Sequence, residues 1–156
     1  MTRDLFGLVA KDNVKPEHTS RRDIGLFRRH RLYGLHINQE DIDFLEYDAP
    51  TQLVALIEYK LALDLNHVKP PQAGEPNYAN LCALEELANR ANIPCFLTFY
   101  NPDYKYYRVF PINQLAYKAG PPKEKTSEYQ YATFLHWLRG RDIPDEVKVK
   151  LYGGGF

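Results

Sequence analysis

The sequence predicts an α/β domain built around a small mixed β-sheet that is flanked by helices. Four short apolar runs, at residues 41–47, 53–60, 95–100 and 106–112, have the length and composition of strands. Residues 77–91 carry a helical stripe of leucine and alanine between the second and third runs. A helix that joins two strands permits a parallel crossover, so the expected order is helix, hairpin, helix, strand, strand, helix.

The first half of the chain supplies the first helix and the hairpin. Thr19 or Ser20 can cap a helix that runs to about Tyr33, where Gly34 would end it. The run DIDFLEY at 41–47 alternates in polarity, and the turn residues at 48–51 separate it from the apolar run at 53–60. Two such runs joined by a short turn predict an antiparallel hairpin.

The second half begins with a proline-rich loop at 64–76, followed by the helix at 77–91. The strands at 95–100 and 106–112 follow, and Pro111 favours the end or the edge of its strand. A last helix is expected from Ser127 to Leu138, with Phe134 and Trp137 in the core. Three glycines near the C-terminus indicate that residues 150–156 are loosely tied.

Length and composition fit one globular domain over residues 1–156, with a core at about 20–112 and a helical extension at about 123–150. No apolar run approaches the roughly 20 residues of a membrane span. The N-terminus has no signal-peptide pattern, so a cytoplasmic location is expected. Cys82 and Cys95 are too few for a disulfide framework and are expected as small buried residues.

Charge is balanced overall but uneven along the chain. Twenty basic and twenty acidic side chains leave no global field that would attract nucleic acid. The segment SRRDIGLFRRHR at 20–31, however, concentrates five arginines: Arg21, Arg22, Arg28, Arg29 and Arg31. On a helix these side chains could contact DNA phosphates, or they could form a solvated helix face.

The hairpin places charged side chains at the end of an apolar strand. Asp41 and Asp43 share one side of the first strand, as Glu58 and Lys60 do on the second. An antiparallel turn near 48–51 would bring Asp43 roughly opposite Glu58. Carboxylate oxygens are the ligands that Mg²⁺ prefers, and a metal-bound water can attack a phosphodiester. Alternatively, Glu58 and Lys60 form a solvated ion pair, and the aspartates are ordinary polar residues at a strand start.

Asp43, a turn, and Glu58-Tyr59-Lys60 resemble the PD-(D/E)XK signature of the restriction-endonuclease-like nucleases. More narrowly, the segments RRHRLYG, DIDFLEY, ALIEYK and NLCALEELANRANIPCFLTFY are similar to small phage-encoded proteins of this type. The resemblance covers residues 20–112 and implies the αβββαβ-type core of that superfamily. The signature's proline is replaced by Ile42.

The resemblance implies a Mg²⁺-dependent hydrolase that cuts phosphodiester bonds in DNA, with Mn²⁺ as a substitute ion. Asp43 and Glu58 would bind the metal together with the Tyr59 carbonyl, and Lys60 would serve the attacking water. Asp41 is a second candidate carboxylate, and Glu17 or Asp23 could complete the site or be ordinary surface. For a phage-encoded protein the location would be the host cytoplasm.

The sequence leaves several properties open. The alternative function is a catalytically inactive nucleic-acid-binding or interaction module on the same fold. The sequence does not distinguish duplex, junction, flap, single-stranded or RNA substrates, endonuclease from exonuclease action, or a monomer from a homodimer. Tyrosines at 100, 104, 106 and 107 could stack on unpaired bases or pack against the sheet.

Overall fold

A computed structural model describes residues 25, 26, 29, 32, 42–49, 52–75 and 78–152. The chain divides into two compact units, residues 1–39 and residues 40–156. In the first unit the four described residues, including Arg29, are helical. The other residues singled out in the basic segment lie outside the described residues, as do three candidate acids: Arg21, Arg22, Arg28, Arg31, Glu17, Asp23 and Asp41.

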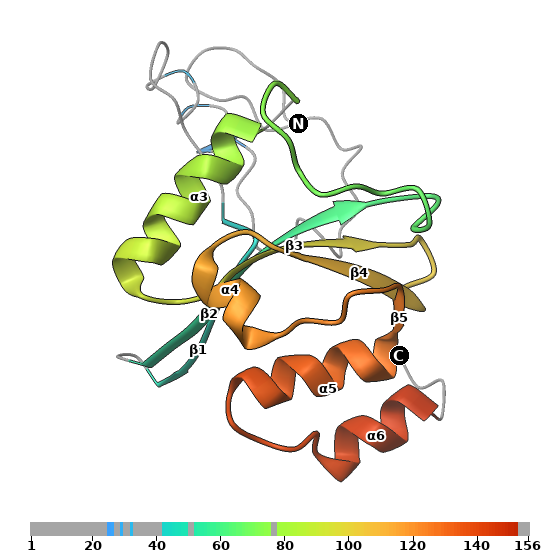
Figure 1. The fold of residues 1–156 in the computed structure, drawn as a ribbon. Helices are drawn as coiled ribbons and strands as arrows, with labels where there is room; N and C mark the ends of the chain where they lie inside the picture. The colour runs from blue at the N-terminus through green and yellow to red at the C-terminus, as the bar shows by residue number, and fades with distance from the viewer. Residues whose placement is uncertain are drawn as a thin grey trace. The chain divides into compact units, whose positions relative to one another are not determined.

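The second unit is an α/β structure around an open five-stranded mixed sheet (Figure 1). The strands lie in the order of the chain: β1 Phe44–Ala49, β2 Gln52–Leu61, β3 Cys95–Tyr100, β4 Tyr106–Pro111 and β5 Thr126–Ser127. β2 and β3 are parallel, and the other neighbouring pairs are antiparallel. Helix α3, Tyr78–Ala91, makes the crossover from β2 to β3, as the sequence predicts.

β2 is a central strand because both of its faces are apolar at mid-length. Ala55 and Ile57 lie in one hydrophobic cluster, whereas Leu56, on the opposite face, lies in another. All three side chains are buried. Continuous apolar strands of this kind are typical of parallel sheets covered on both sides.

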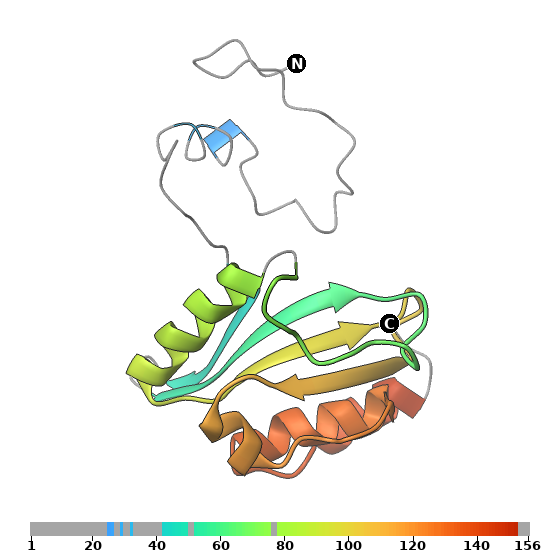
Figure 2. The ribbon, with the colours of Figure 1, turned by 45° about the horizontal axis from the view of Figure 1, so that its top comes forward.

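Helices cover the two faces of the sheet (Figure 2). On one face α3 packs Leu84 and Ala88 against Leu56, so this is called the α3 face. On the other, helix α5, Glu128–Leu138, packs Tyr131 and Phe134 against Ile57 and its neighbours. This second face is called the α5 face.

Asn113 joins the elements at one end of the sheet. This buried residue caps helix α4, Gln114–Ala119, by accepting the Ala116 amide hydrogen bond, and it also accepts one from Cys95 N–H. Its amide nitrogen donates to the carbonyl of Ile93 at 2.8 Å and to the side chain of Asn89 at 3.0 Å. One side chain therefore fixes the end of α3, the start of β3 and the start of α4.

Some sequence expectations differ from the structure. β1 begins at Phe44, not at residue 41, and Asp43 lies in a bend just before it. α4 and β5 were not expected from the pattern. Helix α6, Asp145–Tyr152, includes residues that the glycine-rich ending suggested were loosely tied. Trp137 is exposed, although its ring stacks on buried Phe134.

Candidate active site

Asp43 directly precedes β1, and the backbone of β2 holds its side chain. The amide of Tyr59 donates a 2.9 Å hydrogen bond to Asp43 Oδ2. The N–H groups of Leu56 and Ala62 point toward β3, so the intervening alternation turns Tyr59 N–H toward β1. The Asp43 carboxylate thus takes the place of a backbone acceptor where the β1 ladder stops, just before the first strand residue, Phe44.

Glu58 and Lys60 project from the α3 face near the end of β2. They alternate with Ile57 and Tyr59, which belong to the α5 face. Phe44 pairs with Ile57, so continuing the register by one residue places Asp43 opposite Glu58. Asp43 and Glu58 therefore flank the last pair of the ladder, and their meeting at one ion stays a prediction.

Lys60 lines a pocket of about 40 Å³ between the sheet and the segment that leads into α3. A pocket of this size has room for one or more water molecules. The sheet contributes Lys60, Leu97 and Phe99, and the other lining residues are Lys69, Pro71, Glu75, Tyr78 and Leu81. Glu58 pairs with Leu97 in the parallel register and so lies beside this pocket. The pocket combines two ammonium groups, one carboxylate and one phenol above an apolar floor.

The oxygen donors at this strand end fit a hard divalent cation such as Mg²⁺. Asp43 and Glu58 supply carboxylates, and the Tyr59 carbonyl points to the same side of β2 as its amide, toward β1. Among the described residues no three side chains of His, Cys, Asp or Glu form a metal-binding group. The candidate ligands are therefore two carboxylates and a carbonyl, and Asp41 lies outside the described residues.

The carboxylates influence the titration of their neighbours. Burial, helped by the negative charges of Glu85 and Glu58, raises the pKa of the Cys95 thiol to about 12. Burial also raises the pKa of Tyr59, and the charge of Asp43 adds to this effect, while the hydrogen bond with Tyr131 opposes it. Glu58 thus influences a thiol on the α3 face, and Asp43 influences a phenol on the α5 face.

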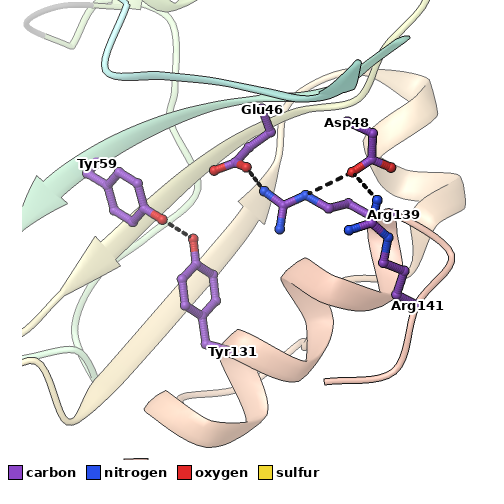
Figure 3. A network of polar contacts seen from close by, with 6 residues as sticks. All are labelled: Glu46, Asp48, Tyr59, Tyr131, Arg139 and Arg141. Atoms are coloured by element: carbon purple, nitrogen blue, oxygen red, sulfur yellow. Dashed lines mark hydrogen bonds and ion pairs between the residues drawn. The ribbon is translucent and has the colours of Figure 1, made fainter. Parts of the chain in front are cut away.

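Contacts from α5 hold the strands that carry the site (Figure 3). The hydroxyl of Tyr59 is hydrogen-bonded to that of Tyr131. Arg139, the C-cap residue of α5, forms ion pairs with Glu46 and Asp48 of β1, and Arg141 also pairs with Asp48. β1 lies at the edge among the described strands, so these ion pairs supplement its ladder with β2.

The structure brings together only part of the predicted site. Asp43, Glu58, Tyr59 and Lys60 lie at one strand end, whereas four of the five arginines lie outside the described residues. The pocket neighbours of Lys60 were not among the predicted site residues: Lys69, Glu75 and Tyr78. The spacing of residues in the sequence does not predict which loop residue contacts a strand. The one local signal is Lys69-Pro70-Pro71, where the two prolines restrict the backbone.

Comparison of the chain with protein-family models, with curated proteins and with solved structures finds no match. Among the described residues, none of the helices has the length and apolar character required to cross a membrane.

Proposed function

We propose that this protein is a metal-dependent nuclease of the restriction-endonuclease-like type that hydrolyses phosphodiester bonds in DNA. The observation that carries the proposal is the position of Asp43. Its carboxylate is fixed at the Tyr59 amide, beside the strand residues Glu58 and Lys60. The parallel β2–α3–β3 crossover after the lysine is the arrangement that the sequence resemblance implies.

Asp43 and Glu58, with the Tyr59 carbonyl, would hold Mg²⁺. A bound Mg²⁺ supplies a water of lowered pKa and offsets charge on the scissile phosphate. The hydrogen bond from the Tyr59 amide restricts the Asp43 side chain and keeps its carboxylate beside β2. Lys60 would orient the attacking water or bind a non-bridging phosphate oxygen from within its pocket.

The second ammonium group in the pocket also has a role in this proposal. Lys69 lines the same pocket as Lys60, and Glu75 is the acidic side chain among the lining residues. The phenol of Tyr78 also lines the pocket and can donate a hydrogen bond to an anion, and the nearby Cys82 raises its pKa. The net positive charge and the donor favour a phosphate group of the substrate.

The test compares Asp43→Asn, Glu58→Gln and Lys60→Ala with the unaltered protein on supercoiled, linear, branched and single-stranded DNA. Mg²⁺ or Mn²⁺ should be required, and each substitution should lower the cleavage rate by roughly 10²-fold or more. Lys118→Ala is the matched control, because Lys118 is an exposed lysine on α4, and it should cut at the normal rate. Cleavage that persists in Lys60→Ala would contradict the proposal. Tight, metal-independent binding without cleavage would favour the inactive binding module.

A further inference from the structure

Four aromatic rings form a continuous row across the α5 face at the end of the sheet where β2 and β3 finish. Phe44 contacts Tyr59 with ring centroids 5.4 Å apart, Tyr59 contacts Tyr100 at 6.2 Å, and Tyr100 stacks on Tyr104 at 5.9 Å. This set is called the aromatic strip. The strip is open to solvent at both ends, where Phe44 is 55% and Tyr104 is 49% exposed. We propose that the aromatic strip binds unpaired bases of single-stranded DNA next to the cleavage site.

Tyr104 has an unusual backbone conformation for a bulky residue. Its φ is +62°, in the left-handed region that glycine and asparagine adopt far more readily. Hydrogen bonds of the β3–β4 turn enforce this conformation: Tyr104 N–H donates to the Asn101 carbonyl, and Tyr106 N–H donates to Asn101 Oδ1. The turn therefore holds a strained residue whose large ring remains half-exposed and parallel to Tyr100, with an interplanar angle of 14°.

Core packing explains the inner rings of this region but not Tyr104. Tyr59 is bonded to Tyr131, and Tyr107 stacks on Tyr131 at 4.4 Å, so these rings join α5 to the sheet. Tyr104 lies beyond the last residue of β3, in the turn before β4. An exposed aromatic face next to a stacked partner is the kind of platform on which nucleobases stack without sequence preference.

The strip lies close to the proposed active site along the chain and across the sheet. Phe44 directly follows Asp43, and Tyr100 pairs with Leu61, the residue after Lys60. The spacing of neighbouring strands and residues places the Cα atoms of Lys60 and Tyr100 roughly 6 Å apart. Lys60 and the strip are therefore neighbours along the backbone, although their side chains lie on opposite faces of the sheet.

Charge and geometry favour a single strand as the occupant. Exposed Lys105 follows Tyr104, so its ammonium group is available for a phosphate. Lys125 Nζ lies 4.9 Å from the ring centre of Tyr106 and also interacts with Asp64, and Glu128 is hydrogen-bonded to Tyr107. Asp103 is the acidic residue of this turn, and its carboxylate accepts the Lys105 amide hydrogen bond. Lys60 and the strip use opposite faces of the sheet, so the substrate must turn around the strand end. Unpaired bases can do so, whereas duplex bases are confined to their stack.

The choice of ligand rests on the proposed nuclease function, but the test does not require cleavage. Fluorescence anisotropy in EDTA measures binding of labelled oligo(dT), oligo(rU) and a blunt DNA duplex. Tyr104→Gly and Tyr104→Asn should weaken oligo(dT) binding roughly ten-fold. Tyr104→Phe keeps the ring and should bind normally. Tyr117→Leu replaces an exposed tyrosine of α4, next to the opposite end of β4, and should also bind normally.

Thermal unfolding of the same variants separates a binding role from a structural one. Because glycine and asparagine relieve the positive φ, their melting temperatures should equal or exceed that of the unaltered protein. A lower melting temperature in both variants would overturn the inference, since the ring would then be holding the turn together. Equal oligo(dT) affinity in all variants would overturn it too, as would tighter binding of the duplex or of oligo(rU).

The two proposals can fail separately. If no DNA is cut with Mg²⁺ or Mn²⁺ but oligo(dT) binding depends on the Tyr104 ring, the strip stands and the nuclease proposal falls. If Lys60-dependent cleavage occurs but substitution of Tyr104 does not change oligo(dT) binding, the nuclease proposal stands and the proposed binding role of the strip is refuted.

Discussion

Replacing Arg139 by methionine should measure how firmly α5 holds β1. The guanidinium group is bonded to Glu46 and lies 3.7 Å from Asp48, measured from Nε to Oδ1. All three side chains are mostly buried: 20% of Arg139, 22% of Glu46 and 14% of Asp48 is exposed. The substitution therefore leaves a largely buried carboxylate of Glu46 without this cation, while Asp48 retains Arg141 at 3.0 Å.

The magnitude follows from this partial burial. Breaking a fully buried ion pair by removing one partner costs about 3–5 kcal/mol, and one charge-assisted hydrogen bond is worth about 1.5–3 kcal/mol. Since about a fifth of each side chain remains in contact with water, we expect a loss of about 2 kcal/mol in the free energy of unfolding. For a chain of this size that corresponds to roughly 4–8 °C in melting temperature.

Thermal and urea unfolding, followed by circular dichroism, provide the assay. Arg141→Met is the matched control: Arg141 pairs with the same strand but is 59% exposed, so its loss should cost less than about 1 kcal/mol. The double variant Arg139→Met with Glu46→Leu removes both charges and should regain most of the lost stability. Equal, small effects of Arg139→Met and Arg141→Met would refute the view that Arg139 anchors the edge strand.

Three further predictions concern other parts of the fold. Asn113→Ala removes four side-chain hydrogen bonds at a buried position, so the free energy of unfolding should fall by about 3 kcal/mol, measured by urea denaturation. Cys95 is buried and its pKa is raised to about 12, so iodoacetamide at pH 8 should alkylate Cys82 first and Cys95 only on unfolding, as read by mass spectrometry. Burial raises the pKa of Tyr131; the folded state therefore keeps a proton that the unfolded chain loses above about pH 10, and stability should fall as the pH rises past that value. Melting curves between pH 8 and 11 test this, and the decline should be shallower in Tyr131→Phe.

The strands and the crossover helix were predictable because their patterns are local. The predicted ranges for β2, β3 and α3 agree with the structure to within a residue at each end. The parallel pairing of β2 with β3 followed from the helix that joins them. In contrast, α6 has no buried residue, and its sequence lacks the apolar stripe from which a helix is predicted.

The candidate site was predictable to the extent that it depends on strand register. A short turn between two strands places Asp43 near Glu58, and alternation places Lys60 on the face of Glu58. No sequence pattern predicts the hydrogen bond from the Tyr59 amide to the Asp43 carboxylate. Nor does any pattern predict that the loop brings Lys69 to the pocket of Lys60. Both depend on tertiary contacts that only the assembled sheet provides.

The most direct test of the proposed metal site is the response of backbone amide signals to Mn²⁺ in ¹H–¹⁵N NMR spectra. A paramagnetic ion held by Asp43 and Glu58 should broaden the amides of residues 43, 44 and 58–60 first. The same titration of Asp43→Asn with Glu58→Gln should leave those signals sharp. Broadening that begins elsewhere in the chain, while the amides of residues 58–60 remain unaffected, would contradict a metal site at the end of β2.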